Sequence, residues 1–143
     1  MFSNSSKYAI KAVIYLALNS NENKKVMAKD IADPINVPKA YIAKLLQELS
    51  RQNIVSSAKG PNGGFYLSEH DKTIPIRKII NVIDGENRLS SCLLSLEECN
   101  EDKPCPLHDS IFPLKTKLLD SLEHKTIMDL ANDIELGNSF LPV

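Results

Sequence analysis

Two short helical segments, a tight turn and a glycine-rich hairpin follow one another over residues 26–68 and restrict the folds open to this chain of 143 residues. The first segment runs through Ile31 and Ala32 and should end at Pro34, because proline breaks a helix interior. The second segment begins near Pro38, since proline suits the first turn of a helix. Its apolar positions recur every three or four residues, as a helix requires, at Tyr41, Ile42, Leu45, Leu46 and Leu49. This pattern is typical of a helix-turn-helix, although a plain helical hairpin in a bundle would share it.

The hairpin decides between these alternatives. The stretch "IVSSAKGPNGGFYLS" places β-prone residues, Ile54, Val55, Phe65 and Leu67, on both sides of a turn rich in glycine. Glycine permits positive φ angles and close approach of the backbone. A hairpin directly after a recognition-type helix is a wing. We therefore predict a mainly α fold with a small β-hairpin, in which residues 1–85 form a winged helix-turn-helix DNA-binding domain.

The charge is divided unevenly along the chain. Residues 1–60 carry nine Lys and Arg against four Asp and Glu, about +5, which leaves −6 for the rest because the total is −1. A basic first half favours a polyanionic partner, here double-stranded DNA. The chain has no apolar run of 18 residues and no signal-peptide pattern, so we expect a cytoplasmic protein with no membrane partner.

Three further helices are predicted. Residues 6–19 form the first, capped by Ser5 or Ser6. The second is an amphipathic helix that ends near Gly85, with a stripe at Ile76, Ile79, Ile80 and Ile83. Thr126 and Asp129 resemble a capping box for a short last helix.

A long helix is expected from Ser110, which would cap it, with Pro113 in its first turn. Its narrow apolar seam is typical of a coiled coil and consists of Leu107, Ile111, Leu114, Leu118 and Leu122. The seam could pack on the protein's own core or on a twin helix. A small DNA reader usually needs two half-sites, so we favour the twin. Residues 110–143 are accordingly assigned to a dimerisation helix, a C-terminal helix and a tail.

All three cysteines lie in one loop, residues 86–109, at Cys92, Cys99 and Cys105, and His108 follows the last. In a reducing compartment such clustering favours metal or redox chemistry over structural disulfides. An iron–sulfur cluster, a Cys3His zinc site, a thiol switch and inert cysteines all remain open. The acidic residues of the loop should raise the thiol pKa values, which favours a metal site over a free thiolate.

Taken in order, these features resemble the Rrf2 family of winged-helix transcriptional regulators. The most specific parts are the three-cysteine loop and the wing motif Gly60, Gly63, Gly64 and Phe65. The resemblance implies a homodimer, formed by crossing the long helices at Ile111, Leu114, Leu118 and Leu122. It also implies an iron–sulfur cluster, most simply [2Fe–2S], on Cys92, Cys99, Cys105 and His108, with zinc as the alternative. The six residues between Cys92 and Cys99 exceed the family's usual five, an insertion that a flexible loop absorbs.

The DNA contacts are expected on the recognition helix and the wing. Such a dimer would read a pseudo-palindromic site, with the second helix in the major groove. The residues assigned to this interface are Lys7, Pro38, Lys39, Ala40, Tyr41, Lys44, Lys59, Asn62 and Gly63. Because no catalytic triad, phosphate loop or paired-carboxylate cleft is recognisable, we predict no enzyme activity. An interaction module that does not bind DNA is the alternative from another class.

Overall fold

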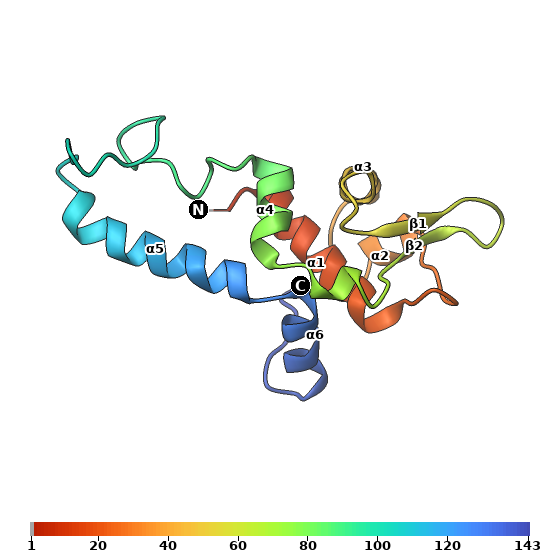
Figure 1. The fold of residues 1–143 in the computed structure, drawn as a ribbon. Helices are drawn as coiled ribbons and strands as arrows, with labels where there is room; N and C mark the ends of the chain where they lie inside the picture. The colour runs from red at the N-terminus through yellow and green to blue at the C-terminus, as the bar shows by residue number, and fades with distance from the viewer. Residues whose placement is uncertain (1) are drawn as a thin grey trace.

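The computed structural model describes residues 2–143. Within this range, helices account for most of the ordered structure, together with a single antiparallel pair of strands. This arrangement confirms the predicted fold class. In chain order the elements are α1 (Asn4–Asn19), α2 (Ala28–Ala32), α3 (Lys39–Arg51), β1 (Ser56–Ala58), β2 (Gly64–Tyr66), η1 (Asp71–Thr73), α4 (Ile76–Asp84), α5 (His108–His124) and α6 (Ile127–Glu135). All except α5 gather into one head (Figure 1).

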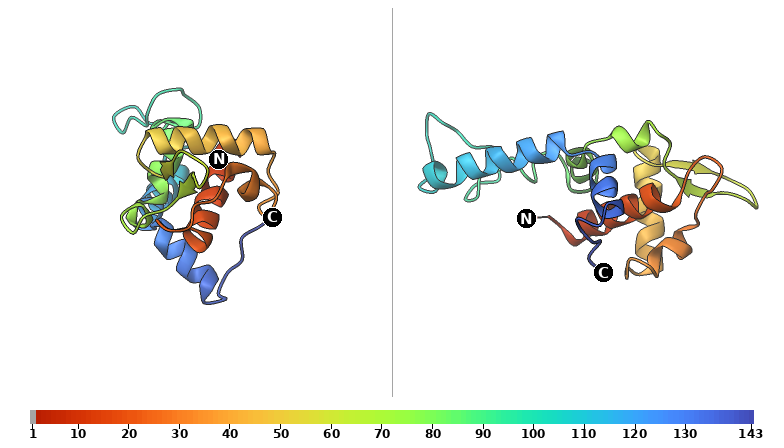
Figure 2. Two further views of the ribbon diagram at one scale, coloured as in Figure 1. Left: turned by 90° about the vertical axis from the view of Figure 1, so that its right-hand side faces the viewer. Right: turned by 90° about the horizontal axis from the view of Figure 1, so that it is seen from below.

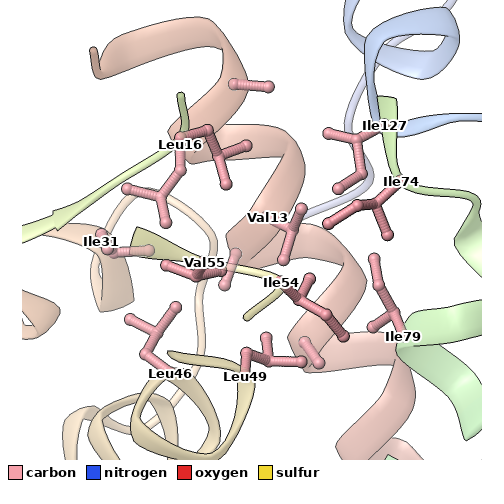
Figure 3. Packing of buried hydrophobic residues seen from close by; sticks show 14 of the residues in the cluster. Val13, Leu16, Ile31, Leu46, Leu49, Ile54, Val55, Ile74, Ile79 and Ile127 are labelled. Carbon is pink, nitrogen blue, oxygen red and sulfur yellow. The ribbon is translucent and has the colours of Figure 1, made fainter. Parts of the chain in front are cut away.

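The core of the head forms around α1, which packs against α3, α4 and α6. Small residues on α1, Ala9 and Ala12, are fully buried and let neighbouring helices approach closely. Side chains from every part of the head meet there (Figure 3). The labelled members are Val13, Leu16, Ile31, Leu46, Leu49, Ile54, Val55, Ile74, Ile79 and Ile127.

The helix-turn-helix is formed by α2 and α3. Ala32 is fully buried between the helices, and Val37 fills the turn from inside at 5% exposure. Asn36 adopts a positive φ of 56°, a conformation that asparagine tolerates better than most residues. Pro38 lies at the N-cap position, one residue before the first turn where it was expected. Tyr41 is 45% exposed, so its place on the predicted apolar stripe was wrong.

The wing consists of β1 and β2, with Ser57 opposite Phe65. Val26 extends this pair, because its N–H and C=O bond to the backbone of Phe65 at 2.9 and 2.8 Å. Ile54 and Val55 precede β1 and are buried in the core. They therefore anchor the wing to the head. The sequence analysis placed both residues in the first strand of the hairpin, and this prediction was wrong.

Two helices begin earlier than predicted. Helix α1 starts at Asn4, and Ser3 caps it by accepting the Ser6 N–H at 3.0 Å. Helix α5 starts at His108, so Ser110 is inside the helix and its hydroxyl donates to the Leu107 carbonyl at 3.2 Å. Proline 113 consequently lies past the first turn, where it removes the N–H that would bond four residues back.

The predicted C-terminal end of α4 and the predicted start of α6 are both confirmed. Gly85 follows α4 with a positive φ of 89°, as expected for the residue that ends a helix. The Thr126–Asp129 capping box is present at the start of α6.

Helix α5 projects from the head as an arm. The segment 86–107 leaves the end of α4 and runs beside α5 to its far end (Figures 1 and 2). No residue of α5 is buried. Its near end rests on the head through Leu119 and Leu122, whereas Leu114 farther out is 65% exposed.

Candidate DNA interface and cysteine pocket

The outer face of α3 carries the first group of predicted DNA contacts. Lys39, Ala40 and Lys44 are exposed there, while the opposite face is buried in the core. The Lys39 ammonium lies 3.7 Å from the Asp33 carboxylate, both well exposed, a pair that solvent weakens. A polyanion could displace this partner at low cost.

The wing tip carries the second group. Lys59 and Asn62 are exposed beside a turn that the Gly63 N–H closes on the Gly60 carbonyl at 2.9 Å. An added Cβ on Gly63 would lie 2.3 Å from the Ala58 carbonyl oxygen, so only glycine fits. The tight turn therefore presents two polar side chains, those of Lys59 and Asn62, at the tip of a narrow hairpin.

A buried carboxylate at the base of the wing was missed by the sequence reasoning. Asp71 is 6% exposed and accepts from the Ser56 hydroxyl at 2.6 Å and the Ser68 N–H at 3.0 Å. The Asp71 N–H in turn donates to the Ser68 hydroxyl at 3.1 Å. The spacing of Ser68 and Asp71 matches a capping box and could have identified this pair.

The N-terminus of α1 lies beside the first turn of α3. The Ser5 and Tyr41 hydroxyls are 3.1 Å apart, and the Tyr8 ring meets the Tyr41 ring edge-on with centroids 5.4 Å apart. Lys7 is exposed on the same helix. The end of α4 completes this region, because Asp84 accepts hydrogen bonds from Ser3 and Ser6.

The pKa of Asp84 is lowered by this environment. Partial burial opposes ionisation, but the hydrogen bonds from Ser3 and Ser6 and the charge of Arg88 outweigh it. The carboxylate is therefore ionised near neutral pH and sits where the positive end of the α1 dipole favours an anion.

The four predicted cluster ligands line one cavity of about 210 Å³ in the loop. Cys92, Cys99 and Cys105 are each half-buried and none forms a disulfide. His108 begins α5, and its backbone N–H donates to the Cys105 carbonyl at 3.0 Å. Within residues 2–143, no three candidate donor groups converge closely enough to hold a single metal ion. A two-iron cluster divides its ligands between two metals, so it does not require such convergence.

The pKa of Cys92 is lowered, contrary to the prediction from the acidic residues of the loop. The main cause is the Leu94 N–H, which donates to Cys92 Sγ at 3.5 Å. The Cys105 thiol, the Ser95 backbone and the Lys115 charge act in the same direction, and burial opposes them. Hydrogen-bond donors and the Lys115 charge thus set the direction of the shift, and no carboxylate of the loop is among its causes.

Lys115 and Phe112 support the pocket from α5. The Lys115 ammonium donates to Cys99 Sγ at 3.2 Å and to the carbonyls of Ser90 and Ser91 at 3.2 and 2.6 Å. The Phe112 ring stacks on His108 with centroids 4.7 Å apart. No local pattern could have linked Lys115 to Cys99, because the two are 16 residues apart and meet only through the path of the loop.

Three of the four predicted dimerisation residues, Ile111, Leu114 and Leu118, lie along an apolar groove. It runs between the loop and α5 and is lined by Arg88, Leu89, Ser91, Cys92, Leu93, Ile111, Leu114, Lys115 and Leu118. Leu93 is 60% exposed beside Leu114. Leu122 lies outside this groove and packs on the head instead.

Comparison with known proteins places these features in one family. The sequence model of the Rrf2 family, described as an iron-dependent transcriptional regulator, matches residues 2–133. An HTH-type transcriptional regulator of Aquifex aeolicus is 37% identical, with 92% of each chain covered. The HTH-type transcriptional regulator IscR of Pectobacterium atrosepticum is 27% identical over 92% of this chain and 79% of its own.

Solved structures share the fold. CymR, the global cysteine regulator of B. subtilis, superposes with a TM-score of 0.75 at 24% identity, covering 92% of this chain and 96% of its own. IscR of T. potens gives a TM-score of 0.73 at 21% identity, covering 98% and 92%. No helix within residues 2–143 is long and apolar enough to cross a membrane.

Proposed function

The chain belongs to the Rrf2 family of DNA-binding transcriptional regulators, which are not enzymes, and from this premise we propose that a [2Fe–2S] cluster controls its DNA affinity. The observation that carries the proposal is the single cavity lined by Cys92, Cys99, Cys105 and His108. Three thiolates and one imidazole form a suitable ligand set for such a cluster. When bound, the cluster supplies a redox centre whose state changes the charge and order of the loop.

The residues around the cavity support this assignment. Lys115 places a positive charge and an N–H donor on Cys99, and hydrogen bonds to ligand sulfurs stabilise an electron-rich cluster. Phe112 fixes the imidazole ring of His108 by stacking. The backbone carbonyl of Glu97 holds Cys92 in place by accepting the Cys92 backbone N–H at 2.8 Å.

We assign residues 1–85 to DNA binding, 86–109 to the cluster loop, and 110–143 to dimerisation and the C-terminal helix. The recognition helix α3 enters the major groove, and the wing approaches the neighbouring minor groove. The contacting residues are Lys7, Pro38, Lys39, Ala40, Tyr41, Lys44, Lys59, Asn62 and Gly63. Two heads in one dimer read a pseudo-palindromic site.

The dimer is proposed to form along α5 through Ile111, Leu114, Leu118 and Leu122. A helix with no buried residue has little reason to persist as an isolated arm, because helices in proteins are stabilised by packing of an apolar face. A twin helix would supply that packing. The loop joins α4 of the head to this arm, so a change in its order alters how the heads are held.

Anaerobic purification followed by iron, sulfide and zinc analysis tests the cluster. We expect a coloured protein with iron and sulfide in equal amounts. Alanine at Cys92, Cys99 or Cys105 should abolish the colour, while His108→Cys should keep it with a shifted spectrum. A colourless protein with stoichiometric zinc would instead support the zinc site and reject the cluster.

The interface is tested separately by Lys44→Ala. Removing one phosphate contact should weaken binding to all duplexes and reduce the slope of log K against log salt by about one. Lys78→Ala, an exposed lysine on α4, is the matched control. Equal slopes for wild type and Lys44→Ala would remove Lys44 from the interface.

One observation favours a thiol switch as a second candidate. Cys92 and Cys105 line the same cavity, and the Cys105 thiol helps to lower the pKa of the Cys92 thiol. Peroxide would oxidise these two thiols to one disulfide and be reduced to water. If this switch operates, peroxide treatment of iron-free protein should remove two hydrogens by mass and change DNA affinity, and Cys99→Ser should leave both effects intact.

A further inference from the structure

Asp84 occupies the junction between the DNA-binding head and the cysteine loop. It is the last residue of α4, and the chain turns into the loop at Gly85. Its carboxylate accepts from the Ser3 N–H at 3.2 Å, from the Ser3 hydroxyl and from the Ser6 hydroxyl at 2.8 Å. Ser6 is fully buried, so this hydrogen-bond partner has no access to water as a substitute.

The same few residues of α1 contact the recognition helix. Ser5, between the two serines that Asp84 holds, lies 3.1 Å from the Tyr41 hydroxyl. Tyr8, one turn farther along α1, packs against the Tyr41 ring. Tyr41 is in the first turn of α3, beside the exposed Ala40 and Lys44.

A single groove joins the three elements. The end of α4 contributes Asp84, α3 contributes Tyr41 and Lys44, and the N-terminal region contributes Ser3 and Ser5. The first turn of α3 is therefore supported on one side by the α1 terminus, whose position depends on the carboxylate of Asp84.

Capping alone does not account for this arrangement. Ser3 already satisfies the Ser6 N–H at 3.0 Å, which is the ordinary cap of α1. The hydrogen bonds that Asp84 accepts instead join α4 to the start of α1. Their donors, Ser6 and Ser3, are 78 and 81 residues from Asp84 in sequence. Their effect is on the relative placement of α4 and α1.

We propose that Asp84 is a positioning residue for DNA recognition: through Ser3 and Ser6 it fixes the α1 terminus, and through Ser5 it sets the orientation of Tyr41 and the first turn of α3. The carboxylate touches no DNA in this scheme. It governs how well α3 matches its preferred sequence, not how strongly the head attracts phosphate.

The test compares Asp84→Asn with wild type on two duplexes: the sequence selected by the wild-type protein from a random library, and a scrambled duplex of the same length. Asp84→Asn should lower the affinity ratio between them about fivefold, because a misplaced α3 loses base contacts. Binding to the scrambled duplex should stay unchanged. Tyrosine-selective NMR of the DNA-free protein should show shifted Tyr41 ring resonances.

Asp129→Asn is the matched control, because Asp129 likewise accepts a hydrogen bond at a helix N-terminus but lies on α6, which does not pack against α3. It should lower thermal stability similarly and leave the affinity ratio and the Tyr41 resonances unchanged. If Asp84→Asn behaves like this control, its role is stability alone and the proposal fails.

Ser5→Ala is a second variant that tests the same proposal, and it remains informative if Asp84→Asn does not fold. This change removes only the exposed hydroxyl that faces Tyr41. It should reproduce the loss in affinity ratio, and the double variant with Asp84→Asn should lose no more than either single change, since both act through one path. A wild-type ratio for Ser5→Ala, or additive losses, would overturn the proposal.

Discussion

Gly63 has no room for a side chain. A Cβ there would overlap the Ala58 and Gly60 carbonyl oxygens at 2.3 and 2.9 Å, and both atoms belong to the backbone of the wing. The neighbouring Gly64 is equally confined, because its Cβ would meet the Val26 carbonyl oxygen at 2.8 Å. The "GPNGG" motif is thus required by close packing as well as by turn conformation.

Gly63→Ala should destabilise the protein by about 1–3 kcal/mol and weaken DNA binding, because the wing must open to admit the methyl group. Thermal unfolding and a binding isotherm measure the two effects. Gly137→Ala is the control for backbone strain without steric overlap: unlike Gly63 it has a positive φ, of 76°, and nothing lies within 4 Å of its Cβ, so it should leave DNA binding unchanged. If Gly63→Ala matches wild type in both measurements, the wing is not held as described.

The lowered pKa of Asp84 has a consequence for stability against pH. A carboxyl whose pKa is lower in the folded than in the unfolded state adds stability above its ordinary value, 3.8, and loses it as pH falls through the folded value. Below pH 4, the stability difference between wild type and Asp84→Asn should therefore shrink. Urea unfolding from pH 6 to pH 2.5 measures it, and a constant difference would contradict the assignment.

At the scale of elements, local signals predicted the helices of the head well. Buried positions on α3 and α4 repeat every three or four residues, and Gly85 and Thr126 mark helix ends. The start of α5 was misplaced because Ser110 and Pro113 resemble a helix start. His108 begins the helix instead, where the Cys105 carbonyl accepts its N–H. The backbone turn at the end of the loop therefore continues directly into the helix, and Ser110 and Pro113 lie inside it.

Leu114→Glu should convert the proposed dimer to a monomer, because a carboxylate cannot be buried at an apolar helix crossing without a partner. Sedimentation velocity at micromolar concentration measures the change. Thr116→Glu adds the same charge on an exposed position of α5 and should leave the dimer intact. A dimeric Leu114→Glu would place the interface elsewhere.

At the scale of the whole molecule, the distribution of charge along the chain follows the division of the structure into a head and an arm. The first 60 positions, which form most of the head, carry nine basic against four acidic residues, and the remainder, which contains the loop and the arm, carries eight basic against fourteen acidic residues. The wing and the arm lie at opposite ends of the molecule (Figure 1). A polyanion would therefore approach the head while the arm remains free to bind a second subunit.

If two heads act together, the monomeric Leu114→Glu variant should lose most of its affinity for the selected palindromic duplex. Its affinity for a scrambled duplex should change far less, because phosphate attraction belongs to each head. Competition binding at fixed salt measures both. Equal losses on the two duplexes would indicate that the arm does not link the heads.

The sequence alone determined the helix-turn-helix, the wing and the clustering of the possible ligands, because each depends on residues close together in the chain. Helical periodicity, proline breaks and glycine turns act over a few residues. Only the tertiary structure decided that Asp84 reaches Ser3, that Lys115 reaches Cys99, and that Tyr41 faces α1. These contacts join distant segments, and their partners are set by how whole helices pack, which no local pattern encodes.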